Sequence, residues 1–152
     1  MRAVVQRVSE ASVSVEGELI AEIGEGLLVL LGVARSDGID EARRLAEKIA
    51  GLRAFDGEGG RMDRSLLDLS PAAAALCISQ FTIYGDLRRG LRPSFTEAAE
   101  ASTAEELYDR FCDELSSLGP RVEKGRFGAR MSVSLRNEGP VTLLLEISKS
   151  IG

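Results

Sequence analysis

The chain has 152 residues, a formal net charge of −5 and a hydrophobic content of 44%, which suits one domain with a substantial core. The absence of histidine and of any Cys-x-x-Cys pair argues against a zinc site and against a histidine-based catalytic triad. The longest apolar run, residues 27–31, is too short to span a membrane, and the N-terminus lacks a signal-peptide pattern. Cys77 and Cys112 lie in apolar contexts and are expected to be reduced core residues of a cytoplasmic protein.

The first part of the chain shows the two-residue alternation that is typical of β-strands. We expect strands at residues 1–8, 11–15 and 18–23, with a hairpin turn at residues 16–17. Residues 27–33 are apolar almost throughout, which predicts a central strand that is buried on both faces.

Two amphipathic helices are predicted from apolar residues at helical spacing. The first covers residues 39–49 and ends near Gly51. The second covers residues 103–118, and Ser102 with Glu105 forms a capping-box pattern at its start.

The remaining strands are predicted at residues 52–55, 74–82, 131–135 and 142–147. With residues 1–8 and 11–15 counted as one strand region, the resulting order is β-β-β-α-β-β-α-β-β, and no linker or internal repeat interrupts it. This order predicts a single mixed α+β domain over residues 1–152, with a largely antiparallel, barrel-like sheet and two helices on one face.

The dipeptide Gly139-Pro140 between the last two predicted strands has two interpretations. Gly-Pro is a turn signal, so the stretch can be the loop of a plain hairpin. Alternatively, an X-Pro bond adopts the cis form at a cost of only about 0.5–1 kcal/mol, and glycine lets a ligand approach the backbone closely. The second interpretation requires a reactive site elsewhere in the chain for this backbone to face.

The densest polar cluster beside a strand end covers residues 79–85 and includes Thr82. One interpretation is a strand that runs into a turn, with polar side chains that satisfy local backbone groups. The other makes Thr82 a nucleophile or a hydrogen-bonding group, with backbone N–H groups as an oxyanion hole. A nucleophilic threonine needs a base beside it, and the sequence offers no histidine and no obvious lysine there.

Charge is distributed unevenly along the chain. Residues 96–118 carry seven acidic side chains and one basic one, whereas residues 119–136 carry five basic side chains and one acidic one. Another basic cluster precedes Pro93. Taken singly, each of these arginines and lysines is most simply interpreted as solvated surface charge.

Six stretches together resemble the D-aminoacyl-tRNA deacylase family, also called D-tyrosyl-tRNA deacylases. They appear in the family's order and extend over nearly the whole chain, so the combination is far more specific than any one of them. The matching stretches are residues 1–8, 26–33, 79–85, 92–95, 125–129 and 137–142.

The resemblance implies an enzyme that hydrolyses the ester bond of D-aminoacyl-tRNA and leaves the L-form intact, as chirality proofreading in translation. Glycyl-tRNA is an additional substrate to expect, because glycine has no side chain to be rejected. The resemblance further implies a homodimer that works in the cytoplasm without a metal, a cofactor or a membrane.

The resemblance also implies roles for particular residues. The aminoacyl pocket would be lined by Ser79, Gln80, Phe81 and Thr82. Gly139 and Pro140 would enter the pocket of the other subunit, where their carbonyl groups exclude an L-amino acid, and Arg7 would hold this dipeptide in its cis geometry. Chirality would then be read by main-chain atoms, so the side chain of the substrate is barely read.

An aminoacyl ester is already activated, so the ribose 2′-OH of the tRNA could replace the missing base. The basic stretches would then contact phosphate. The residues expected to do so are Arg88, Arg89, Arg92, Lys124 and Arg126. Two alternatives remain open at this point: an RNA-binding module without hydrolysis, and a hydrolase in which Thr82 is a covalent nucleophile.

Overall fold

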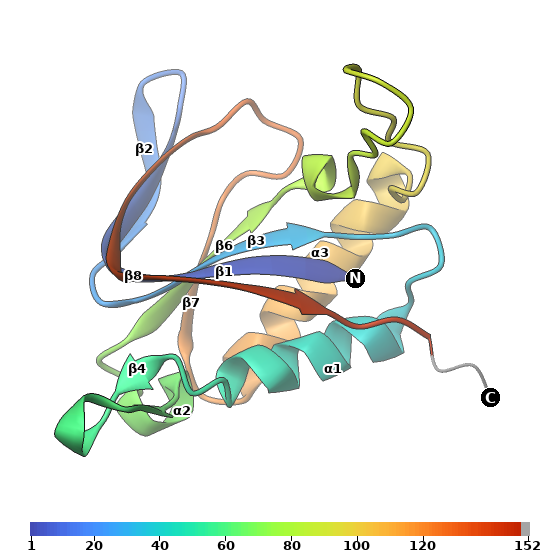
Figure 1. Cartoon of the computed structure of the whole chain (residues 1–152). Helices are drawn as coiled ribbons and strands as arrows, with labels where there is room; N and C mark the ends of the chain where they lie inside the picture. Colours follow the sequence, from blue (N-terminus) through green and yellow to red (C-terminus); the bar gives the residue numbers. More distant parts are fainter. Residues whose placement is uncertain (150–152) are drawn as a thin grey trace.

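A curved six-stranded sheet forms the centre of the structure, a computed structural model that describes residues 1–149 (Figure 1). Its strands are β1 (Arg2–Val15), β2 (Glu18–Ile23), β3 (Gly26–Gly32), β6 (Ala74–Ser79), β7 (Arg121–Lys124) and β8 (Ser132–Glu146). The strand order is β2-β1-β3-β6-β7, and β8 also pairs with β1. Pairing is antiparallel around β1 and parallel between β3, β6 and β7. The predicted mixed α+β domain with a barrel-like sheet is confirmed.

Two long helices cover one face of the sheet and pack against each other, as predicted (Figure 1). They are α1 (Ile39–Ala50) and α3 (Ala101–Ser117), and a third, four-residue helix is α2 (Leu66–Leu69). Gly51 follows α1 directly, in agreement with the sequence. The short helix α2 was not predicted, although Ser65 and Asp68 form a reciprocal capping box at its start.

The sheet is apolar on both faces, and each face has its own core. Leu27, Val29 and Leu31 of β3 point toward the helices. Their neighbour Leu28 points the other way, into a second cluster with Val13 of β1 and other residues from β2 and β6. The alternation of side chains along a strand explains how β3 serves both cores, and the predicted burial of this strand on both faces is confirmed.

The N-terminal strands differ from the prediction only in their continuity. Residues 1–8 and 11–15 were expected as two strands, but β1 runs unbroken from Arg2 to Val15. The hairpin turn follows at Glu16 and Gly17, which both have positive φ angles of 52° and 78°. Two consecutive positive φ angles match the right-handed twist of the flanking strands, which is why this turn suits a hairpin.

The region between α1 and β6 forms a small separate hairpin. Its strands are β4 (Phe55–Asp56) and β5 (Met62–Arg64), joined by the 3₁₀ turn η1 (Glu58–Gly60). Of the strand predicted at residues 52–55, only Phe55 is paired.

The strand predicted at residues 74–82 is too long. β6 ends at Ser79, and residues 81–84 form the 3₁₀ helix η2 (Phe81–Tyr84). The parallel neighbours of β6 have ended by this point: β3 pairs up to Ser79, and β7 up to Cys77. Without a strand on either side, local turn hydrogen bonds replace the ladder.

The predicted start of the second helix was wrong. α3 begins at Ala101 with Glu100 as its N-cap, so Ser102 lies inside the first turn and forms no capping box with Glu105. Helical bonding already begins with the N–H of Ala104, which donates to the carbonyl of Glu100 at 2.8 Å. The basic segment after α3, expected as a loop, contains β7, because its backbone completes the edge of β6.

The hairpin interpretation of Gly139-Pro140 is also wrong. β8 is one strand of 15 residues that pairs with β1 on both sides of the dipeptide, and residues 138–141 bulge out of the ladder opposite Arg7. A long partner strand explains this result, since β1 offers one uninterrupted edge to both halves of β8.

Gly26 is a position where neighbouring backbone leaves no room for a side chain. A methyl group there would lie 1.8 Å from the carbonyl oxygen of Ala74, in the parallel ladder between β3 and β6. We therefore expect Gly26→Ala to lower the free energy of unfolding by about 3 kcal/mol. The matched control is Gly24→Ala, whose added methyl would be 4.0 Å from the nearest atom and should change stability by less than about 0.5 kcal/mol. Urea unfolding measures both, and equal effects would contradict this explanation.

Candidate active site

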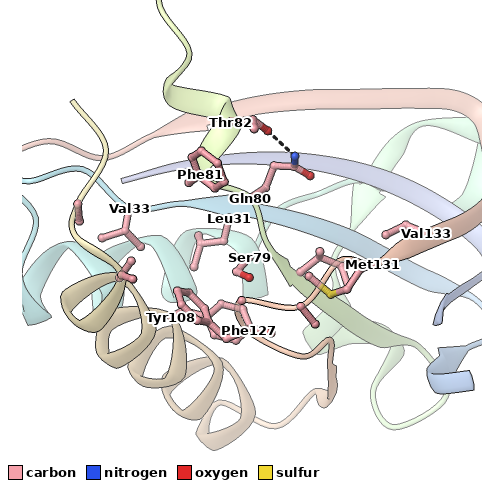
Figure 2. A pocket seen from close by; sticks show the side chains of 16 residues that line it. Leu31, Val33, Ser79, Gln80, Phe81, Thr82, Tyr108, Phe127, Met131 and Val133 are labelled. Atoms are coloured by element: carbon pink, nitrogen blue, oxygen red, sulfur yellow. Dashed lines mark hydrogen bonds between the residues drawn. The ribbon is translucent and has the colours of Figure 1, made fainter. Parts of the chain in front are cut away.

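A cavity of about 430 Å³ opens where β6 ends and η2 begins (Figure 2). Its walls come from β3, β6, η2, the start of α3 and the segment between β7 and β8, and they are mostly apolar. Residues 79–82, singled out from the sequence, all line it. A concave, mainly apolar site with a few polar groups at one side is the usual form of a small-molecule pocket.

The polar residues of this cavity are held by main-chain hydrogen bonds. The N–H of Gln80 donates to the carbonyl of Leu31 at 2.7 Å, which extends the contact between β6 and β3 by one residue. The N–H of Gly85 then donates to the carbonyl of Thr82 at 2.9 Å and closes the turn. The position of Thr82 is therefore set by the backbone of two elements.

Tyr84 anchors the far end of η2 in the protein. Its ring is buried and lies against Gly32, where an added methyl group would come within 3.1 Å of the ring. Arg2 lies on β1, and its guanidinium group is 4.5 Å from the centroid of the Tyr84 ring. Burial raises the pKa of the Tyr84 phenol above its ordinary value, so the group remains neutral near pH 7 and serves as an anchor.

Thr82 has a hydrogen-bond partner but no base. Its hydroxyl accepts a hydrogen bond from the side-chain amide of Gln80 (Figure 2). Within residues 1–149, this is the one side-chain hydrogen bond found for Thr82. An amide cannot take up a proton near neutral pH, so the site lacks the partner that would activate a threonine nucleophile.

Phe81 lies at the mouth of the cavity, with 58% of its surface exposed. Its ring meets the ring of Phe95 edge to face, with 5.1 Å between the centroids. Phe95 belongs to the loop of residues 87–95, which contains Arg88, Arg89 and Arg92 and which we call the arginine-rich loop. This contact therefore brings the arginine-rich loop next to η2.

The inner wall contains aromatic residues that the sequence interpretation did not assign to a site. Tyr108 of α3 was assigned to an apolar helix stripe, and it lines the cavity beside Phe127, with 6.0 Å between the ring centroids. The hydroxyl of Tyr108 donates to the carbonyl of Cys77 at 2.7 Å, so this polar atom is satisfied within the protein. No sequence signal distinguishes Tyr108 from its core neighbours.

Cys77 and Cys112 are free and buried, as predicted.

Gly139 and Pro140 do not meet the cavity within one chain. Both are exposed, neither is among the residues that line the cavity, and the peptide bond between them is cis. Figure 1 shows β8 beside β1, with its middle part far from η2. The structure therefore brings residues 79–82 together but leaves the Gly-Pro dipeptide at a separate place.

Arg7 lies directly opposite the bulge that contains this dipeptide. Its Nε donates to the carbonyl of Glu138 at 3.0 Å, and its Nη1 donates to the carbonyl of Ala54 and to Oδ1 of Asp56. Arg7 thus connects β1, the bulge and the small β4–β5 hairpin. The contacts with Ala54 and Asp56 could not be found from the sequence, because they depend on where that hairpin folds.

The five expected phosphate-binding cations differ in their surroundings. Arg88 forms a bidentate ion pair with Asp86, and this hydrogen bonding lowers the pKa of that carboxyl group to about 2. Lys124 is paired with Asp109 at 2.7 Å. Within residues 1–149, no ion pair is found for the three other cations, which are exposed: Arg89, Arg92 and Arg126.

Neither a metal-binding cluster nor a membrane-spanning helix is found in the part of the chain that the structure describes. Residues 1–149 contain no group of three or more histidine, cysteine, aspartate or glutamate side chains arranged to hold a metal ion. Among their helices, none has the length and apolar character needed to cross a membrane.

The sequence is similar to a known family over nearly its whole length. Residues 4–146 match the family described as D-Tyr-tRNA(Tyr) deacylase. The D-aminoacyl-tRNA deacylase of Fervidobacterium nodosum is 52% identical over 149 residues, which are 98% of this chain and 99% of the relative. The D-aminoacyl-tRNA deacylase of Roseiflexus sp. (strain RS-1) is 57% identical over 146 residues, with 96% and 93% covered.

Solved structures show the same fold. A protein named c-Myc DNA Unwinding Element Binding Protein superposes with a TM-score of 0.91 at 39% identity, over 98% of this chain and 100% of that one. A probable eukaryotic D-amino acid tRNA deacylase superposes with a TM-score of 0.81 over 96% of this chain and 98% of the other. At 19% identity, the second similarity concerns the fold alone.

Proposed function

This chain belongs to the D-Tyr-tRNA(Tyr) deacylase family and is a D-aminoacyl-tRNA deacylase, a hydrolase acting on an ester bond; from this premise we propose how its site works. The cavity at the end of β6 accepts the aminoacylated end of the tRNA, and residues 79–82 contact the ester. The observation that carries this proposal is the composition of the site: an apolar cavity with Thr82 and Gln80 at one side and no base beside them.

The proposed chemistry uses the substrate as its own base. The ester of an amino acid with a ribose hydroxyl is activated, so positioning and charge stabilisation are sufficient help. The neighbouring 2′-OH of the terminal ribose relays a proton from the attacking water to the ester oxygen, which leaves as the ribose hydroxyl when its bond to the carbonyl carbon breaks. The main-chain N–H groups of Phe81 and Thr82, at the start of η2, stabilise the oxyanion, since the first N–H groups of a helix lack partners within it.

Selection against L-amino acids is proposed to come from a second subunit. Gly139 and Pro140 lie apart from the cavity of their own chain and are exposed, so they are available to a partner. In a homodimer, the bulge of one subunit enters the cavity of the other, and its carbonyl groups leave no room for the L-configuration. Arg7 supports the bulge through the carbonyl of Glu138.

The edge of β8 supports the proposed dimer. Within residues 1–149, β8 pairs only with β1, which leaves its other edge open, and Leu144 on this strand is 81% exposed. Open edges and exposed apolar side chains favour association with another chain.

The tRNA is proposed to contact the arginine-rich loop beside η2. Arg89 and Arg92 are exposed there, and the contact between Phe95 and Phe81 joins this loop to the mouth of the cavity. Arg126 is exposed near the opposite wall of the cavity. Arg88 and Lys124 contribute less, because each already has a carboxylate partner. Such contacts with phosphate do not require a positive net charge, since the local charge is what the tRNA meets.

The substrate range and the place of action complete the proposal, and the first follows from a pocket that reads configuration by main-chain atoms. Glycyl-tRNA is accepted as well, because glycine has no side chain for the bulge to reject. Since aminoacyl-tRNA is used by the ribosome, the proposed place of action is the cytoplasm.

The experiment that tests this function compares D- and L-aminoacyl-tRNA carrying the same amino acid. We expect the D-form to be hydrolysed at least about a hundredfold faster, a difference of about 2.7 kcal/mol in transition-state stabilisation. Single-turnover rates with labelled amino acid measure both reactions. Equal rates would contradict selection by configuration, and binding of tRNA without hydrolysis would leave an RNA-binding module instead.

Replacing Thr82 distinguishes the two catalytic mechanisms. If Thr82 only donates or accepts a hydrogen bond, Thr82→Ala should slow hydrolysis by about tenfold or less. If Thr82 were a covalent nucleophile, the loss should approach the roughly 10⁶-fold typical of a removed nucleophile. We expect the small effect, together with near-complete loss of turnover on tRNA that ends in 2′-deoxyadenosine. A trapped acyl-enzyme would contradict this mechanism.

The proposed dimer is tested by the mass of the active species. Light scattering at the protein concentration of the assay should give twice the mass of one chain. A monomer that retains full activity and full selection against L-aminoacyl-tRNA would rule out a contribution from the partner subunit.

The contact with tRNA is tested by its dependence on salt. Arg89→Gln and Arg92→Gln should each reduce the slope of log K against log salt concentration by about one phosphate contact. Arg88→Gln should change the slope less, because Asp86 already neutralises that side chain. Arg43→Gln on α1, where Asp40 and Glu47 pair with the arginine, is the distant control. Unchanged slopes for Arg89 and Arg92 would assign them to the solvated surface.

A further inference from the structure

We propose that Asn137 is a positioning residue for the selection against L-amino acids. Its side chain bonds across the two ends of the β8 bulge, from residue 137 to residues 141 and 142, and we call this closure the neck of the bulge. The proposal rests on the proposed function, in which Gly139 and Pro140 exclude the L-form. It concerns a residue that touches neither the cavity nor the proposed substrate, and that acts through the backbone it holds.

The bulge, residues 138–141, is the stretch of β8 where the register with β1 is interrupted: none of its residues is paired with a residue of β1. Thr142 pairs with Gln6, and Asn137 pairs with Val8, so Arg7 alone faces residues 138–141. These residues belong to β8 but have no paired residues on β1, so a regular ladder does not define their path. Their conformation must therefore be set by side-chain contacts or by turn geometry.

Asn137, the residue directly before the bulge, supplies such contacts. Its Oδ1 accepts a hydrogen bond from the N–H of Val141 at 3.0 Å, and its Nδ2 donates to Oγ1 of Thr142 at 2.9 Å. Gln6 on β1 also donates to Oγ1 of Thr142, at 3.4 Å. The amide of Asn137 is thus bonded to Val141, the last residue of the bulge, and to Thr142, the first residue after it.

Arg7 contacts the same segment from β1. It donates to the carbonyl of Glu138, and a methyl group added to Gly139 would lie 2.9 Å from Nη2 of Arg7. Gly139 also has a φ angle of +122°, which side chains of L-residues rarely adopt. The contact of Arg7 and the contacts of Asn137 hold different parts of the bulge, so neither replaces the other.

The chemistry of the asparagine side chain fits this role. Closing the neck requires an acceptor for the N–H of Val141 and a group that can bond to a hydroxyl. Aspartate can satisfy both needs, because the hydroxyl of Thr142 can reverse and donate to the carboxylate. Alanine satisfies neither need, and it leaves the N–H of Val141 to other partners.

Loss of the neck should affect selection more than hydrolysis. Selection depends on the position of main-chain carbonyls in the bulge, and a small displacement is enough to admit the other configuration. Hydrolysis of the D-form depends on η2, which lies elsewhere in the chain and is held by Tyr84 and Leu31.

The experiment measures single-turnover rates on matched D- and L-aminoacyl-tRNA with the full-length enzyme. We expect Asn137→Ala to raise the ratio of the L-rate to the D-rate about tenfold, the effect of two lost hydrogen bonds of ordinary strength, while the D-rate changes less than about threefold. Asn137→Asp should restore most of the selection. Thr142→Val should give part of the effect of Asn137→Ala, and Thr142→Ser should give none.

Two controls keep the outcome interpretable. Ser132→Ala lies on the same strand outside the bulge and is exposed, so it should change neither rate. Gly139→Ala disturbs the bulge directly, and it should lose selection whether or not Asn137 matters. Thermal unfolding of each variant shows whether the strand itself is intact.

The proposal is overturned if Asn137→Ala keeps the wild-type ratio while Gly139→Ala loses it. It is also overturned if Asn137→Ala lowers both rates equally together with the unfolding temperature, because the residue would then be merely structural. If Gly139→Ala keeps the wild-type ratio as well, the bulge does not select configuration, and the failure lies with the proposed function.

Discussion

The structure depends on the pairing of β1 with strands on both of its edges. One edge carries β3 and β2, and the other carries the whole of β8. Two arginines on this strand reach the two parts of the proposed site: Arg2 lies over the ring of Tyr84 at the end of η2, and Arg7 contacts the bulge of β8. At about 3.4 Å per residue, these positions are roughly 17 Å apart along the strand. A single chain therefore presents a cavity and a bulge that are separated by the strand that supports both.

The proposed chemistry matches this architecture, because the groups proposed to stabilise the oxyanion and to select the configuration are main-chain N–H and carbonyl groups. A main-chain N–H or carbonyl does not gain or lose a proton near pH 7 and has no side-chain rotamers, so its position follows directly from the fold. The cost is that the elements around it must fit closely. Gly32 against Tyr84 and Gly26 against Ala74 are two such places, where an added methyl group would be too close to a neighbour.

Charge is also arranged locally. The acidic segment that produces the negative net charge is largely the exposed surface of α3 and the residues before it, whereas the arginine-rich loop stands next to η2. Pairing with nearby carboxylates reduces the number of available cations, as Arg88 and Lys124 show. A polyanion that approaches the cavity would meet the cations that remain, and not the average charge of the chain.

The sequence by itself determined the elements whose signals are local. The alternation in β1, the uniform apolar run of β3 and the stripe of α1 reflect burial patterns that repeat within a few residues, and the structure confirms them. The resemblance to a family also rests on short stretches, and one of them contains residues 79–82, which line the cavity. Tertiary structure decided what depends on partners distant in the chain. β6 ends at Ser79 because its neighbours end, β8 continues past Gly139-Pro140 because β1 offers an unbroken edge, and Tyr108 lines a cavity because α3 packs beside β6. A local pattern carries no record of where a neighbouring strand stops, which is the physical reason that these features appear only in the folded chain.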